Sequence, residues 1–255
     1  MRGMDFVSEL IYSEKFYVGL AVGVATLLIY FLWSACGGKG KTGNSGRTVL
    51  LVGPNGAGKT AMFHKLCFGT TVESQMSMKP DVASVRLGKG DGKDSGKAPL
   101  DFVDVPGHPR LRGQIVKKYA NSVAGMVFVI DSSDPKIRES AEFLYDILTN
   151  PVFDERAPPI LIASNKNDLT NGKRGLDDLR SLLEAELSRL KETRSSLAET
   201  GSGSKNDADE PISLGMANEK FSFERHSPCA VSFCFSSVVK DELSSIRDFS
   251  VASIE

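Results

Sequence analysis

The chain has 255 residues, of which 41% are hydrophobic and 25% are charged, and its formal net charge is -1. This length and composition suit one sizeable globular core, and the balanced charge argues against direct binding of nucleic acid. The four cysteines form no C-x-x-C pair and no cluster with histidine at zinc spacing, so neither a cysteine metal centre nor a disulfide framework is expected.

The first element expected along the chain is a membrane anchor at residues 16–33. Its sequence, FYVGLAVGVATLLIYFLW, has eighteen consecutive residues without a charge, about the minimum for a helix that crosses a bilayer. The leader, residues 1–15, mixes acidic and basic side chains, unlike a secretory signal peptide. Because the charged residues that follow the segment up to Arg47 are all basic, the positive-inside rule places the remaining chain in the cytosol and the leader in the lumen or on the exterior. A buried core helix is the alternative.

A tether and a single globular domain follow the anchor. Residues 34–46 are rich in glycine and serine, which predicts a flexible linker. In residues 47–255, β-branched apolar runs alternate with amphipathic ones, which predicts strands and helices in turn. Strands are expected at residues 48–52, 82–87, 100–105, 125–131, 159–165 and 229–235, and helices at 61–67, 137–149, 176–190 and 243–249.

This alternation predicts an α/β fold with a doubly wound, mostly parallel six-stranded sheet whose ligand lies at the carboxyl ends of the strands. Strands 82–87 and 100–105 flank a polar, glycine-rich connection, so they are expected to pair as antiparallel neighbours at one edge. A polar segment at about residues 192–218 has no aromatic residue, which predicts a mobile insertion in place of a packed element.

The sequence GPNGAGKT follows the first strand and opens a helix. It fits the pattern G-x-x-x-x-G-K-[ST], whose backbone N–H groups converge on phosphate at the positive end of a helix. Lys59 supplies a charge for the terminal phosphates, and Thr60 supplies a hydroxyl for Mg²⁺. The predicted nucleotide-binding residues of this phosphate loop are Gly53, Pro54, Asn55, Gly56, Ala57, Gly58, Lys59 and Thr60.

The sequence NKND, residues 165–168, indicates which base is bound. Guanine presents two adjacent donors, N1–H and the 2-amino group, and the carboxylate of Asp168 can accept from both, whereas adenine has no such pair. Asn165 can bond the acceptors of guanine, and the aliphatic stem of Lys166 can cover the base. An ATPase of the transporter class is disfavoured, because LSGGQ is absent and strand 125–131 does not end in Asp-Glu. GTP with Mg²⁺ is therefore the expected ligand.

The sequence DVPG, residues 104–107, closes the third strand. Asp104 at the strand end can reach Mg²⁺ through water, and the Gly107 N–H can contact a γ-phosphate that exists only before hydrolysis. A simple turn is the alternative for this motif alone, but in combination with the other two motifs it predicts a nucleotide-sensing switch.

Together these features resemble the signal recognition particle receptor subunit beta family of membrane-anchored small GTPases. The resemblance rests on the amino-terminal span, GPNGAGKT, DVPGH followed by Arg-Leu-Arg, VFVIDSS followed by AEFLYDILTN, NKND and the polar insertion before FSFER. It implies a P-loop GTPase fold in a single-pass protein of the endoplasmic reticulum membrane. It also implies that the cytosolic GTPase domain, in its GTP form, binds the receptor alpha subunit and anchors it for cotranslational targeting.

The resemblance extends to further site residues. Phe235-Ser236-Ser237 aligns with the base-contacting loop of the family, so Ser236 and Ser237 are predicted base contacts. The first switch departs from the family pattern, since Met76 stands where a magnesium-binding Thr is expected, and methionine is a poor ligand for a hard cation. Ser77 and Thr71 are the candidate replacements.

Hydrolysis is expected to be slow. His108 stands where Ras-type switches have a glutamine, and its imidazole can position water or act as a base, with a purely structural switch role as the alternative. The predicted catalytic group is His108, Lys59 and Gly107, and no arginine finger is evident in the sequence. Two other functions stay open, an Arf/Sar-type vesicle-coat GTPase and a GTP-locked scaffold with little hydrolysis.

Overall fold

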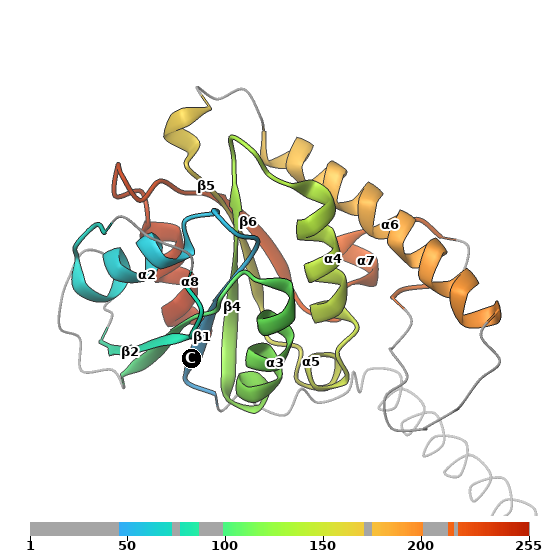
Figure 1. Ribbon diagram of the computed structural model, residues 1–255, viewed down its shortest axis with the longest axis horizontal. Coiled ribbons are helices and arrows are strands. Elements are labelled where there is room, and N and C mark those ends of the chain that lie inside the picture. Colours follow the sequence, from blue (N-terminus) through green and yellow to red (C-terminus); the bar gives the residue numbers. More distant parts are fainter. Residues whose placement is uncertain are drawn as a thin grey trace, which may run out of the picture. The chain divides into compact units, whose positions relative to one another are not determined.

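A six-stranded sheet with the order β2-β3-β1-β4-β5-β6 is the centre of the fold (Figure 1). The computed structural model describes residues 46–72, 77–86, 99–170, 175–200, 214–216 and 219–254, all within the compact unit Gly43–Glu255. The expected anchor at 16–33 and most of the tether lie outside the described residues. Within the described part of the chain, no helix has the length and apolar character needed to cross a membrane.

The sheet is parallel except at one edge, where β2 pairs antiparallel with β3. The strands are β1 (Thr48–Val52), β2 (Asp81–Val85), β3 (Leu100–Asp104), β4 (Val123–Asp131), β5 (Ile160–Asn165) and β6 (Val231–Phe235). Strands β1 and β5 are buried along their whole length, and β4 is buried up to Asp131. Such continuous apolar runs belong to central strands covered on both faces. The expected mostly parallel sheet with one antiparallel edge strand is confirmed.

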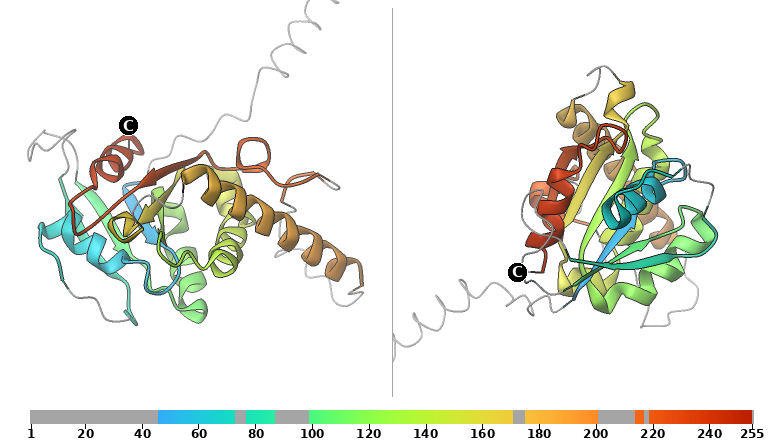
Figure 2. Two further views of the ribbon diagram at one scale, coloured as in Figure 1. Left: turned by 90° about the horizontal axis from the view of Figure 1, so that it is seen from above. Right: turned by 90° about the vertical axis from the view of Figure 1, so that its left-hand side faces the viewer.

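Helices cover both faces of the sheet (Figure 2). Because successive side chains of a strand point to opposite faces, Leu50 and Val52 belong to one core, and Val49 and Leu51 to the other. The first core lies under α3 (Pro109–Tyr119), α4 (Ile137–Leu148), α5 (Pro151–Arg156), α6 (Leu176–Thr200) and α7 (Phe223–His226). The second lies under α2 (Lys59–Phe68) and α8 (Ser244–Ala252).

Helix α3 was not among the expected elements. Pro109 occupies its first turn, and the His108 side chain accepts a hydrogen bond from the Arg110 N–H at its amino end, which are typical start signals. Its buried side chains are Arg112 and Val116. Its apolar residues Leu111, Ile115, Val116 and Tyr119 are also spaced as on one face of a helix, so the periodic signal for this helix was present in the sequence and was missed. The short helices α5 and α7 were also not expected.

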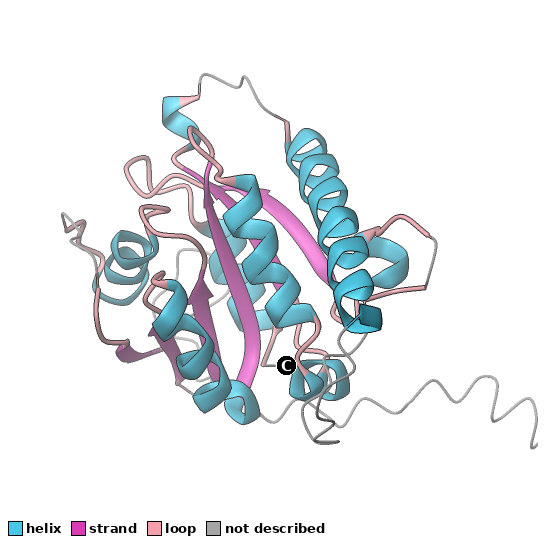
Figure 3. Ribbon diagram, turned by 45° about the vertical axis from the view of Figure 1, so that its right-hand side comes forward, coloured by secondary structure: helices cyan, strands magenta, loops and turns pink. Residues whose placement is uncertain are grey.

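The boundary expected for the mobile insertion, at about residue 192, is wrong. Helix α6 continues to Thr200 and runs alongside α4 (Figure 3). The Arg194 guanidinium lies 4.4 Å from the centroid of the Tyr145 ring and bonds to Asp146 at 3.1 Å. These contacts with α4 hold a polar stretch in the helix although it has no apolar face.

Part of the same expected insertion is packed. The Lys191 side chain is buried and donates to the backbone carbonyls of Met216 and Glu219, while Leu214 is 2% exposed within the first core. Residues 201–213 and 217–218 lie outside the described residues. Any mobile insertion is therefore shorter than the sequence pattern predicts.

Candidate nucleotide-binding site

The loops that follow β1, β3, β4 and β5 meet at one edge of the sheet, because these strands run parallel. This edge is where open α/β sheets bind ligands. The residues predicted from GPNGAGKT, DVPG and NKND lie in these loops, in the first turn of α2, or at the last position of a strand, which is Asp104 in β3 and Asn165 in β5.

Three glycines of the phosphate loop, Gly53, Gly56 and Gly58, have positive φ, and the first and last of them are also closely packed. Gly53 and Gly58 have φ of 143° and 91°, in the region that side chains rarely adopt. A Cβ on Gly53 would lie 2.2 Å from the Val129 carbonyl oxygen, and one on Gly58 would lie 2.5 Å from Asn165 Nδ2. The loop is therefore packed against β4 and the NKND motif.

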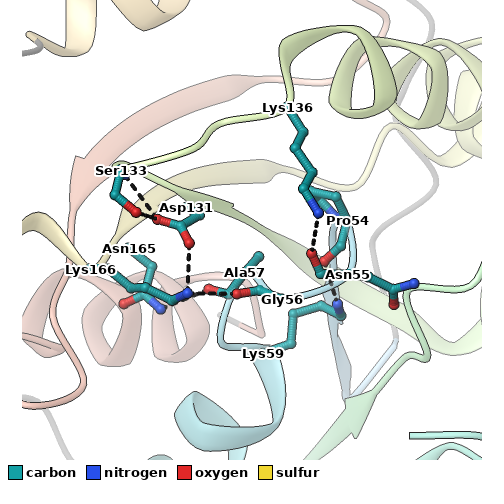
Figure 4. Close-up of polar contacts among 10 residues, drawn as sticks. All are labelled: Pro54, Asn55, Gly56, Ala57, Lys59, Asp131, Ser133, Lys136, Asn165 and Lys166. Atoms are coloured by element: carbon teal, nitrogen blue, oxygen red, sulfur yellow. Dashed lines mark hydrogen bonds and ion pairs between the residues drawn. The ribbon is translucent and has the colours of Figure 1, made fainter. Parts of the chain in front are cut away.

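Four successive carbonyl oxygens of the phosphate loop, at residues 54–57, each accept a hydrogen bond from a side chain (Figure 4). The pairs are Lys59 Nζ to Pro54 (2.9 Å), Lys136 Nζ to Asn55 (3.3 Å), Lys166 Nζ to Gly56 (2.8 Å) and Asn165 Nδ2 to Ala57 (2.9 Å). In a trans peptide unit the following N–H points away from the carbonyl. The N–H groups of this loop are therefore not directed at its carbonyl oxygens, and a loop of successive N–H groups of this kind can bind an anion.

Lys59 is a buried cation at the amino end of α2. Its side chain is 7% exposed, and this burial lowers its pKa from 10.5 to about 8, although the negative charge of Asp104 acts in the opposite direction. A buried ammonium is stabilised by an anion placed beside it. Lys59 is therefore suited to bind the terminal phosphates, as the sequence predicts.

Three oxygen-bearing side chains gather next to Lys59. Thr60 Oγ1 donates to Asp104 Oδ2 at 2.6 Å and lies 3.3 Å from Ser77 Oγ. Asp104 is 1% exposed, and its Oδ1 has no hydrogen-bond partner among the described residues. Burial raises the Asp104 pKa, while the Thr60 hydrogen bond and Lys59 oppose the increase. Two hydroxyls and a carboxylate with a free buried oxygen are a donor set that fits Mg²⁺. Met76 lies outside the described residues.

The DVPG motif lies directly against the phosphate loop. A Cβ on Gly107 would come within 2.5 Å of Asn55 Oδ1 and 2.9 Å of Lys59 Nζ. His108 follows as the cap of α3, with Nδ1 accepting from the Arg110 N–H at 3.3 Å. This contact is structural, and a direct catalytic role of His108 stays a prediction.

The predicted base contacts meet at the other end of the phosphate loop. Ser237 Oγ donates to Asp168 Oδ1 at 2.6 Å, and Ser236 Oγ lies 3.4 Å from Asn165 Oδ1. The Ser236 N–H is engaged by the Ser164 carbonyl at 2.9 Å, whereas the Ser237 N–H makes only a long contact of 3.4 Å with Glu242. Of the two serines, Ser237 is thus better placed to offer its N–H to guanine O6.

The family model of the signal recognition particle receptor beta subunit matches residues 44–228 of the chain. The chain belongs to this family.

Similarity to individual members of the beta subunit family supports this match. The human signal recognition particle receptor subunit beta is 32% identical over 220 residues, which cover 85% of this chain and 77% of the human protein. The structure of the mammalian SRP receptor is similar with a TM-score of 0.65 and 29% identity, covering 82% of this chain and 100% of that one. A Chaetomium thermophilum SRb-GTP/SRX complex, at 24% identity and a TM-score of 0.57, covers 81% of this chain and 96% of that one and has the same fold. The sheet is therefore that of a small GTPase.

The structure adds two residues to the site that had no predicted site role, Asp131 and Lys136. Asp131 belongs to the sequence VFVIDSS, and Lys136 belongs to no motif. Asp131 ends β4 and accepts from Lys166 Nζ at 2.6 Å and from the Ser133 hydroxyl at 2.6 Å. Burial raises the Asp131 pKa, but these hydrogen bonds outweigh burial and hold it below its usual value. The position of both residues was the available signal, since Asp131 is the last residue of the central strand β4 and Lys136 lies in the loop after it.

In this member of the beta subunit family, Gly107→Ala is expected to weaken GTP binding by about tenfold, equivalent to about 1.4 kcal/mol. The new methyl group would force Asn55 and Lys59 out of their positions on the phosphate loop. Titration with a fluorescent GTP analogue measures the change. Gly113→Ala is the matched control, because a Cβ there meets nothing within 4 Å and the position lies within α3, where alanine is the better helix former. Equal affinities of the two variants would contradict the expectation.

Proposed function

We propose that the chain is the GTP-binding switch subunit of a signal recognition particle receptor, and that it holds the receptor alpha subunit at the endoplasmic reticulum membrane. The observation that carries the proposal is the convergence of Lys59, Thr60 and Asp104 at one end of the phosphate loop, with Asp168 beside Ser237 at the other. A single guanine nucleotide with Mg²⁺ accounts for both groups. Family membership favours this function over the Arf/Sar-type alternative.

At the phosphate end, the N–H groups of the loop and Lys59 bind the phosphates. Thr60 and Ser77 offer hydroxyls to Mg²⁺, and Asp104 reaches it through water, with its free buried Oδ1 as the acceptor. When bound, Mg²⁺ supplies positive charge that stabilises the charge developing in phosphoryl transfer. No arginine finger is evident in the sequence, which agrees with slow hydrolysis.

At the base end, Asp168 selects guanine by accepting from N1–H and the 2-amino group. The Ser237 hydroxyl orients the carboxylate by binding Oδ1, and Asn165 ties the motif to the phosphate loop. Adenine offers no matching pair of donors, so this arrangement supports GTP over ATP.

The switch is Gly107 together with helix α3. Gly107 lies against Asn55 and Lys59, so its N–H can bind a γ-phosphate, and α3 begins immediately after it at the His108 cap. Loss of the γ-phosphate removes the contact that fixes the position of α3. The Chaetomium neighbour is a complex of SRb-GTP with SRX, which supports a GTP-dependent partner for this chain.

The membrane location rests on residues 16–33. Their eighteen uncharged residues are long enough to span a bilayer, and the basic residues after them favour a cytosolic GTPase domain. The protein is accordingly a single-pass protein with residues 1–15 in the lumen.

Liposome co-flotation tests the anchor and the switch together. The full chain in liposomes is expected to float the alpha subunit at least about fivefold better with GTP than with GDP, a coupling in the usual range for a two-state switch. A chain without residues 1–33 should bind the alpha subunit with GTP but leave it in the dense fraction. Flotation that is equal with GTP and GDP would favour a locked scaffold, and a full chain that fails to float would contradict the anchor.

A further inference from the structure

Lys136 precedes the first turn of α4 in an unusual backbone conformation. Its φ is 39° and its ψ is 54°, in the left-handed region that non-glycine residues adopt only where the surroundings impose it. The backbone on either side is held by Ser140, whose hydroxyl donates to the Pro135 carbonyl at 2.9 Å and whose N–H donates to the Lys136 carbonyl at 2.9 Å. The fixed backbone conformation therefore sets the direction in which the Lys136 side chain leaves the main chain.

That direction is toward the phosphate loop, where Lys136 Nζ donates to the Asn55 carbonyl at 3.3 Å (Figure 4). Lys59 Nζ makes the same kind of contact with the neighbouring Pro54 carbonyl. Two ammonium groups are thus bound to adjacent carbonyls of one loop. Lys136 is exposed, so its side chain has the freedom to move from this carbonyl to a stronger acceptor.

Asn55 marks the end of the loop at which a terminal phosphate is expected. Gly107 lies against Asn55 and Lys59, whereas the base-recognition residues Lys166 and Asn165 hold the next two carbonyls. The positive charge of Lys136 also contributes to the lowered pKa of Lys59, after burial as the main cause. The two ammonium groups therefore repel each other, and an anion between them would relieve the repulsion.

We propose that Lys136 is a further nucleotide-binding residue, which contacts the terminal phosphate of GTP and thereby favours GTP over GDP. The proposal rests on the guanine-nucleotide function proposed above. The hydrogen bond from Lys136 Nζ to the neutral Asn55 carbonyl is long, at 3.3 Å. A phosphate oxygen is a stronger acceptor for an ammonium group. GDP lacks the group that Lys136 would bind, so its affinity depends little on this residue.

Lys136→Gln in the full chain, purified in mild detergent, tests this role by titration with fluorescent GTP and GDP analogues. GTP affinity is expected to fall about tenfold, as for loss of a hydrogen bond to a charged group, while GDP affinity stays within about twofold. Lys136→Arg should retain most of the preference for GTP. The matched control is Arg138→Gln, because Arg138 lies on the same helix, is exposed and pairs with Glu142 at 3.3 Å.

Equal losses for GTP and GDP would show that Lys136 only holds the loop, and unchanged affinities would show no role, so either result overturns the proposal. If Arg138→Gln also loses the preference for GTP, the effect comes from any lost positive charge near the site, and the proposal is overturned as well. If wild type prefers GTP and the glutamine variant keeps that preference, only the role of Lys136 fails. A wild-type chain that binds no guanine nucleotide contradicts the proposed function itself.

Discussion

Lys59→Met is expected to reduce GTP affinity on the order of a hundredfold or more, because removing one partner of a buried charge contact costs about 2–5 kcal/mol. The same change is expected to raise the melting temperature of the nucleotide-free chain. Lys59 is 7% exposed, and its pKa, lowered to about 8 by burial, shows that the folded chain disfavours the ammonium. Methionine has a similar length and no charge, and each kcal/mol gained corresponds to about 2–4 °C.

The stability difference between wild type and the Lys59→Met chain should depend on pH. Because the folded pKa of Lys59 is about 8 and the unfolded value is 10.5, the unfolded chain binds more protons between these values, so wild-type stability rises with pH across that window. Below about pH 8 both states are protonated, and the contribution of Lys59 is constant and unfavourable. The advantage of the methionine variant should therefore be largest at neutral pH and shrink toward pH 10.

Differential scanning calorimetry of the nucleotide-free chains at pH 7 and pH 9.5 measures this difference. Lys117→Met is the control, since Lys117 is exposed on α3 and its removal should change neither stability nor GTP affinity appreciably. A Lys59→Met chain that melts below wild type at pH 7 would contradict the account of Lys59 as a destabilising buried charge.

Asp168→Asn is expected to exchange GTP for xanthosine triphosphate. Guanine loses an acceptor for its two donors, whereas the 2-oxo group of xanthine gains a donor from the new amide. The Ser237 hydroxyl, which now donates to Asp168 Oδ1 at 2.6 Å, should hold the amide oxygen and turn its NH₂ group toward the base. The loss of GTP affinity should be on the order of 10⁴-fold, as for sites left with unpaired polar groups.

Competition between the two triphosphates for the full chain measures this exchange. Adding Ser237→Ala to the variant should weaken the preference for xanthosine triphosphate, because the amide then has no fixed orientation. Asp177→Asn, at an exposed position near the start of α6, is the control and should leave GTP binding unchanged. Undiminished GTP affinity in Asp168→Asn would remove the basis for assigning guanine specificity to this motif.

The central sheet could be predicted from the sequence because β1, β4 and β5 are buried on both faces and are almost continuously apolar. The spacing of Leu111, Ile115 and Tyr119 would also have predicted helix α3. The burial of its charged Arg112 could not be predicted, since it depends on the Phe143 ring, whose centroid lies 4.3 Å from the guanidinium. The far end of α6 was also beyond prediction. There Arg194 reaches Asp146 on another helix, a contact that no local pattern contains.

Some residues of the site could likewise be predicted from the sequence, and others could not. Lys59, Thr60, Asp104 and Asp168 belong to short motifs with a known chemical purpose, so their positions followed from the sequence. Lys136 belongs to no motif, and its contact with Asn55 spans 81 positions of the chain. Such a contact depends on how tightly β4 and β1 pair and on one left-handed turn, neither of which can be derived from composition or periodicity.

The hydrogen bonds from Asn165 and Lys166 to the phosphate loop join segments 108 and 110 positions apart. We expect them to make base recognition and phosphate recognition cooperative, because a base that orders the NKND motif would also order the loop proposed to receive the phosphates. The two halves of a nucleotide should thus bind far better joined than as separate fragments. Release is then a concerted event, in which loosening one end of the pocket also loosens the other.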